Sequence, residues 1–153
     1  MILRKLKVVI LLIIILLADV NVDAQTNALG LRLALGDGTG IEASYQHNFS
    51  KVNRVEIDLG LDTDIFLRGA AAYQWIFDLS KLYTGFNWYA GVGGGLVLYD
   101  GGANIGIVGN LGIEYNFEFP LQLSLDLQPG YYFFKGGSDF GFGGVALGIR
   151  YKF

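Results

Sequence analysis

Ten charged residues are placed so that their side chains could form one network of ion pairs. Each lies on the polar face of a segment in which apolar residues alternate with polar or small ones, so β-strands would direct all ten to one side of a sheet. They are Arg32, Glu42, Arg54, Glu56, Asp58, Arg68, Glu114, Asp126, Arg150 and Lys152. Charges in a narrow space with little water must pair, because an unpaired buried ion destabilises the fold. This pattern predicts a structural plug, and a gated or selective ion path is the alternative.

The residues that could support catalysis or bind a metal form no complete set. His47 is the only histidine, and Ser50 follows it by three positions, which puts the two side chains on opposite faces of a strand. The chain contains no cysteine, and no further ligands accompany His47 in a metal-binding pattern. Residues 141–146 fit the letters of a dinucleotide-binding pattern, which has meaning only between a strand and a helix. We expect no catalytic residue, no cofactor, no metal site and no enzyme activity.

Length and composition suit one apolar domain without a nucleic-acid partner. The chain has 153 residues, of which 52% are hydrophobic, and its mean hydropathy is +0.42. Its formal net charge is −3, and the basic residues form no cluster beyond the first few positions, so nucleic-acid binding is not expected. The 23 glycines follow no Gly-X-Y period, which excludes a collagen-like chain.

Residues 1–24 have the pattern of a cleaved secretory signal peptide. Arg4, Lys5 and Lys7 precede an unbroken aliphatic stretch at 8–17, and Val22 and Ala24 are the small residues expected before a cleavage site. Cleavage after Ala24 would leave residues 25–153 as the mature domain. A retained transmembrane anchor is the alternative, but the aliphatic stretch is short of the roughly 20 residues that a spanning helix needs.

The rest of the chain alternates apolar with polar or small residues in segments separated by turn residues. This period of two predicts strands at 29–35, 41–49, 54–61, 65–79, 86–98, 104–118, 121–133 and 141–153. Eight strands with short turns fit an all-β, antiparallel, up-and-down barrel, and in lipid such a sheet must close so that every backbone group is paired. An eight-stranded barrel is just wide enough inside for side chains. We predict a transmembrane β-barrel.

The composition of the two faces indicates which one lies outside. The polar face is rich in glycine, alanine, serine and asparagine, which suits a narrow interior; Gly91, Gly93 and Gly95 would make room there for Tyr89, Tyr99 or an arginine. A soluble lipocalin-like barrel, with the apolar face inside, is the alternative. Aromatic residues recur on the apolar face at one end of the strands, as in an interfacial girdle. They are Tyr45, Phe49, Trp75, Phe77, Phe86, Trp88, Tyr115 and Phe117, with Tyr151 and Phe153 at the same level. Tyr131 and Phe133 begin a sparser girdle at the other end.

The signal peptide, the alternating strands and the ending Arg150-Tyr151-Lys152-Phe153 together resemble the small eight-stranded outer-membrane β-barrels of the OmpA/OmpX-like class. The resemblance covers essentially residues 27–153 and implies a monomer in the outer membrane of a Gram-negative bacterium. It also implies contacts with outer-membrane lipids and lipopolysaccharide. Tyr151 and Phe153 would be the signal read by the outer-membrane assembly machinery.

The resemblance implies a cellular location and a fold more than a biochemical function. The expected role is structural or surface-interacting, with a narrow pore or small-ligand passage as the alternative and a lipid A-modifying enzyme as a further one. Short outer loops put an adhesin role in doubt. Five aspartates in those loops suit turn chemistry, and bridging of lipopolysaccharide phosphates through divalent cations is their alternative role. They are Asp37, Asp62, Asp64, Asp100 and Asp139.

Overall fold

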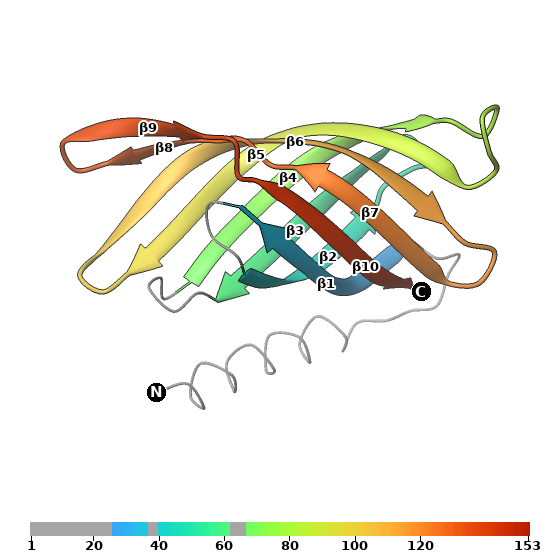
Figure 1. Ribbon diagram of the computed structural model, residues 1–153, viewed down its shortest axis with the longest axis horizontal. Helices are drawn as coiled ribbons and strands as arrows, with labels where there is room; N and C mark the ends of the chain where they lie inside the picture. The colour runs from blue at the N-terminus through green and yellow to red at the C-terminus, as the bar shows by residue number, and fades with distance from the viewer. Residues whose placement is uncertain (1–25, 37–39, 62–66) are drawn as a thin grey trace.

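The computed structural model describes residues 26–36, 40–61 and 67–153, and these fold into strands and turns (Figure 1). The predicted signal peptide, residues 1–24, lies outside the described residues. None of the described residues belongs to a helix long and apolar enough to cross a membrane. The strands are β1 (Asn27–Leu35), β2 (Gly40–Asn48), β3 (Asn53–Leu61), β4 (Leu67–Asp78), β5 (Phe86–Tyr99), β6 (Gly102–Asn116), β7 (Leu121–Leu127), β8 (Gly130–Phe134), β9 (Gly137–Gly141) and β10 (Val145–Lys152).

Eight of these strands close into an antiparallel barrel. Each strand from β1 to β6 pairs with the next one along the chain, β7 pairs with β10, and β10 returns to β1. The closing seam aligns Leu29 with Tyr151 and Leu35 with Val145. At its end, Asn27 and Phe153 exchange backbone hydrogen bonds of 2.8 and 3.0 Å. This confirms the predicted all-β, eight-stranded, up-and-down barrel.

The barrel has two distinct ends. At one end, which we call the chain-terminal end, β1 begins, β10 ends, and the turns at 49–52, 79–85 and 117–120 join neighbouring strands. At the other, which we call the hairpin end, β5 turns into β6 at residues 100–101 and β8 turns into β9 at residues 135–136. Figure 1 shows the β8–β9 hairpin on the side opposite the C-terminus, extending the wall formed by β4, β5 and β6.

The last two predicted strands differ from the structure in a specific way. The segment 121–133 is divided into β7 and β8 by Gln128 and Pro129, because proline has no N–H to donate. Its register against β6 nevertheless continues, since Gly109 donates a 2.7 Å backbone hydrogen bond to the Pro129 carbonyl. The loop predicted at 135–139 is shorter than expected, because residues 137–139 belong to β9.

The predicted closing strand, 141–153, is interrupted by a bulge. Residues 142–144 lie opposite only two residues, Gln128 and Pro129, between the β8–β9 and β7–β10 pairings. Gly143 and Gly144 adopt left-handed backbone angles, with φ of 70° and 69°. The extra residue reverses the alternation, so Phe140 pairs with Tyr131 and Val145 pairs with Leu127, and both partners belong to the outer face. Alternation read straight through the bulge gives the wrong face for β9.

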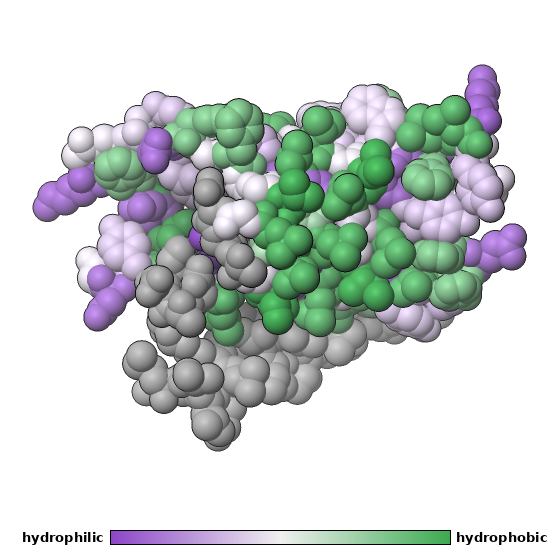
Figure 2. Space-filling model, in the orientation of Figure 1, coloured by the Kyte–Doolittle hydropathy of each residue, from purple (hydrophilic) through white to green (hydrophobic). Residues whose placement is uncertain are grey.

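The two faces of the barrel wall differ sharply in polarity. Exposed side chains on the outer face are mainly aliphatic or aromatic, as in the row Val145, Leu147, Ile149 and Tyr151 of β10. Figure 2 shows hydrophobic residues over the middle of the visible face, with hydrophilic residues gathered toward the two ends. The residues between them in sequence are buried inside the barrel, which is where the core lies.

Replacement of Gly144 by alanine should destabilise the barrel by about 1–3 kcal/mol, the usual cost of a non-glycine residue in a strained left-handed conformation. A Cβ at this position would also meet the carbonyl oxygen of Leu35. The matched control is Gly141→Ala, because a Cβ there has no atom within 4 Å. The free energy of unfolding of refolded protein in detergent measures both, and equal values for the two variants would contradict the bulge geometry.

Candidate functional site

The lumen contains the buried polar and charged side chains that the structure describes. Among the described residues, the buried hydrophobic set is small and mostly alanine. The buried polar set includes eight of the ten charged residues singled out from the sequence, and only Arg68 and Lys152 are half-buried. Charged side chains are rarely fully buried in proteins unless they are paired. The lumen is therefore the candidate functional site, and its ion pairs decide what it can do.

Arg32 joins three strands across the lumen. From β1 it forms ion pairs with Glu42 on β2 and with Asp126 on β7. Its Nε also donates to Asp126 Oδ2 at 3.3 Å, so the guanidinium contacts both oxygens of that carboxylate. The hydroxyl of Tyr89, on β5, donates to the same Oδ2 at 3.1 Å. Bidentate pairing of this kind fixes the orientation of both groups as well as their distance.

Arg150 lies at the centre of a second group of hydrogen bonds. Its guanidinium donates to Ser44 at 2.9 Å and Ser124 at 2.8 Å, and its Nη2 lies 3.2 Å from Glu56 Oε2. Gln46 donates to the same oxygen of Glu56. A Cβ at position 148 would lie 2.3 Å from Ser124 Oγ and 2.8 Å from Arg150 Nη1, so glycine there leaves room for both side chains. The last strand is thereby linked to β2, β3 and β7 through one side chain.

Arg54 holds a third group, nearer the chain-terminal end. Its Nη1 lies 2.7 Å from Glu114 Oε2, its Nε donates to Gln74 at 2.6 Å, and its guanidinium carbon lies 4.7 Å from the centre of the Tyr89 ring. Asn87 also donates to Glu114, at 3.2 Å. Tyr89 thus belongs to two of these groups. Its hydroxyl donates to Asp126, the partner of Arg32, and its ring packs against the guanidinium of Arg54.

Asp58 differs from the other buried carboxylates of the network in its partners. It forms no ion pair within 4 Å among the described residues, and its hydrogen bond from Gln128 Nε2 is long, at 3.4 Å. Its Oδ1 is buried without a partner.

The two half-buried cations lie at opposite ends of the barrel: Arg68 on β4 toward the hairpin end, and Lys152 on β10 at the chain-terminal end.

The central role of Tyr89 was not predicted from the sequence, where it appeared only as a residue that needs room. The room comes from Gly112 on the facing strand, where a Cβ would lie 2.5 Å from the Tyr89 ring. Gly95, predicted to make room for Tyr89, Tyr99 or an arginine, instead faces Tyr132, whose hydroxyl would lie 2.7 Å from a Cβ there. The position of Tyr89 on the polar face was the available signal.

The aromatic residues predicted as a girdle lie at the chain-terminal end and contact one another. Phe77 stacks on Trp88 with 4.1 Å between ring centres, and Tyr115 packs against Phe86 and Phe117 at 5.1 and 4.6 Å. The other members are also at least partly exposed: Tyr45, Phe49 and Trp75. Tyr151 and Phe153 stack at 6.4 Å on the closing strand. Their reading by an assembly machinery stays a prediction.

The structure does not bring His47 and Ser50 together. His47 Nδ1 lies 2.7 Å from the side-chain oxygen of Asn27, whereas Ser50 donates to Asn53 at 2.6 Å in the next turn.

Of the loop aspartates, Asp37, Asp62 and Asp64 lie outside the described residues, and Asp100 and Asp139 are exposed at the hairpin end. Within the described ranges, no group of three or more histidine, aspartate or glutamate side chains is arranged to hold a metal ion.

Family models, curated proteins and solved structures were compared with this chain, and none of them matches it. What the protein does must therefore follow from its own geometry: a closed barrel with an ion-paired lumen and an apolar outer face.

The ion pairs predict a clear difference between two isosteric changes in the lumen. Asp126→Asn removes the charge that Arg32 contacts through both carboxylate oxygens, and breaking a buried pair in this way should cost about 3–5 kcal/mol. Asp58→Asn removes a carboxylate that has no ion pair among the described residues, so its effect should be well below that of Asp126→Asn. Urea unfolding of the refolded variants in detergent gives both values. A larger loss for Asp58→Asn would show that the Arg32 pair is not the main constraint.

Proposed function

We propose that this chain is a non-enzymatic integral β-barrel protein of a bacterial outer membrane, with a structural or surface-interaction role and a lumen plugged by its charged network. The observation that carries the proposal is the inverted polarity of the barrel. Arg150 is 0% exposed and Glu56 is 1% exposed inside the lumen, whereas Leu31 and Leu147 are 53% and 51% exposed outside.

A hydrocarbon environment explains the outer face better than water does. Leaving a leucine or isoleucine side chain in water forfeits about 1.5–3 kcal/mol relative to full burial. The outer face repeats such residues on several adjacent strands, including Leu31, Leu111 and Ile149. Monomeric soluble proteins rarely expose so continuous an apolar surface. A closed sheet also leaves no unpaired strand edge around the barrel itself, as a lipid environment requires.

The lumen argues against the lipocalin-like alternative. A soluble barrel of that kind would hold its apolar side chains inside, around a core or a ligand. Here the buried hydrophobic residues of the described chain are mostly alanines, and the long buried side chains are arginines, glutamates and glutamines. This arrangement supports a plug, because each buried arginine is engaged by carboxylates or amide oxygens.

The remaining parts of the proposal come from the termini. A cleaved signal peptide would export the chain from the cytoplasm, and the terminal Tyr151 and Phe153 would direct it to the outer-membrane assembly machinery. The aromatic girdle would then lie at the membrane interface on the periplasmic side, facing outer-membrane lipids, with lipopolysaccharide at the other end. A monomer suffices, because the barrel closes within one chain.

Spin labels on the outer face should report a hydrocarbon environment. The chain has no cysteine, so Leu111→Cys and Leu147→Cys each provide one labelling site. In lipid vesicles, both labels should be accessible to oxygen and protected from a water-soluble nickel complex. The matched control is Lys81→Cys, an exposed turn residue at the chain-terminal end, where the nickel complex should dominate. Ready access of the nickel complex to Leu111 and Leu147 labels would contradict a membrane-spanning barrel.

The plugged lumen should not conduct ions. In planar bilayers, the purified protein should show no stable conductance, because three arginine groups and their partners cross the lumen between β1, β2, β3, β6, β7 and β10. Steady, ion-selective currents from the unmutated protein would favour the narrow-pore alternative instead. A pore-forming barrel inserted under the same conditions provides the positive control.

A further inference from the structure

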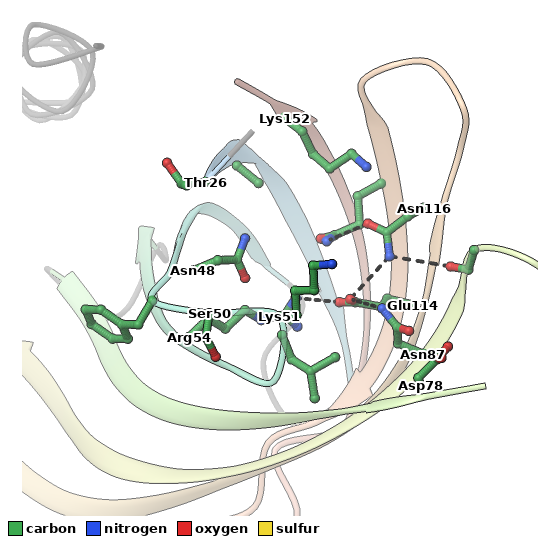
Figure 3. A pocket seen from close by; sticks show the side chains of 15 residues that line it. Thr26, Asn48, Ser50, Lys51, Arg54, Asp78, Asn87, Glu114, Asn116 and Lys152 are labelled. Carbon is green, nitrogen blue, oxygen red and sulfur yellow. Dashed lines mark hydrogen bonds and ion pairs between the residues drawn. The ribbon is translucent and has the colours of Figure 1, made fainter. Parts of the chain in front are cut away.

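The chain-terminal mouth of the lumen is a polar cavity that the plug does not fill. Its volume is about 540 Å³, and it opens at the end where β1 begins and β10 ends (Figure 3). Its lining includes four carboxamide side chains: Asn48, Asn87, Asn116 and Gln122. Carboxamides both donate and accept hydrogen bonds. Asn116 and Gln122 already use both groups within the protein, which fixes their orientation in the lining.

The floor of this cavity is held by the Arg54 group. Glu114 lines the cavity, but its carboxylate is engaged by Arg54 and by the amides of Asn87 and Asn116, at 2.7, 3.2 and 3.3 Å. Asp78, the other acid in the lining, accepts hydrogen bonds from the backbone and hydroxyl of Ser80, both at 2.8 Å. Both acids are therefore already occupied by partners within the protein.

Two lysines in the lining are not matched in this way. Lys51 comes from the turn between β2 and β3, and Lys152 comes from β10. Figure 3 shows both side chains extending into the mouth. Neither forms an ion pair within 4 Å with a carboxylate in the part of the chain that the structure describes. The mouth thus presents two ammonium groups beside the Asn48 amide, whereas the amides of Asn87, Asn116 and Gln122 donate within the protein.

We propose that this mouth binds a small anion that carries carboxylate or phosphate groups. The two lysines supply the attraction, and the Asn48 amide, which has no side-chain hydrogen bond among the described residues, supplies a donor beside them. The anion enters from the chain-terminal side and stops at the Arg54–Glu114 floor, so binding requires no passage through the barrel. The proposal depends on the barrel fold and extends beyond the proposed structural role.

The test uses the folded mature chain in micelles of a non-ionic maltoside, which brings no phosphate of its own. Citrate and inorganic phosphate are titrated at physiological ionic strength while backbone amide NMR signals are followed, with glucose as the neutral control. Both anions should produce saturable shifts at Lys51, Asn116 and Lys152, and glucose should produce none. Absence of saturable shifts in a protein whose spectrum is well dispersed would overturn the anion site, and would leave the membrane proposal untouched.

Charge-matched variants distinguish a built site from general attraction. Lys51→Gln and Lys152→Gln should each weaken citrate binding by about three- to fivefold, as expected for the loss of one partly exposed ion pair. Lys81→Gln is the control, because Lys81 lies in a turn at the same end but outside the cavity lining. Equal weakening by Lys81→Gln would overturn the proposal, because it would show that net charge alone attracts the anion.

A further arm identifies the source of the anionic group. Phosphatidylglycerol is added to the micelles of the citrate-bound protein. Displacement of citrate with shifts at the same three lining residues would assign the site to a lipid headgroup phosphate. Retention of citrate would assign it to a soluble anion. Shifts confined to the aromatic girdle would report lipid binding to the outer face. If citrate also produces no saturable shifts at the three lining residues, the proposal is overturned.

Discussion

Pairing of Arg32, Arg54 and Arg150 with carboxylates inside the closed sheet is the constraint on which the rest of the structure depends. Each guanidinium bridges strands that are not neighbours in sequence, and Arg32 alone links β1, β2 and β7. The low dielectric of the lumen strengthens these contacts and makes the loss of one partner costly. The surrounding glycines and alanines follow from the same constraint, because an eight-stranded barrel has room for long side chains only where small residues face them.

Placing the charges inside leaves the apolar residues outside. The backbone satisfies its own hydrogen bonds around the ring, so the outer face can be apolar at every alternate position without a structural cost in lipid. The same surface in water would favour aggregation. The apolar outer face and the ion-paired lumen are thus two consequences of one closed sheet, and together they support a membrane location more strongly than either feature alone.

Alternation with a period of two sufficed to predict the eight-stranded barrel, most of its turns and the burial of eight of the ten charged residues. It did not predict which charges meet, because Arg32 and Asp126 are brought together by closure of the sheet and not by any local pattern. It also failed at residues 142–144, where two left-handed glycines insert an extra residue and reverse the faces of β9. Tyr89 shows the same limit, since its two partners, Asp126 on β7 and Arg54 on β3, come from distant strands.

Polarised infrared spectroscopy of the protein in aligned bilayers tests the membrane-spanning barrel most directly. The account predicts strongly dichroic amide bands that correspond to strands tilted by about 35–45° from the membrane normal, as in transmembrane barrels of this size. The protein should also stay with the bilayers through an alkaline wash. Amide bands without dichroism, or release of folded barrel into the wash, would contradict the central claim.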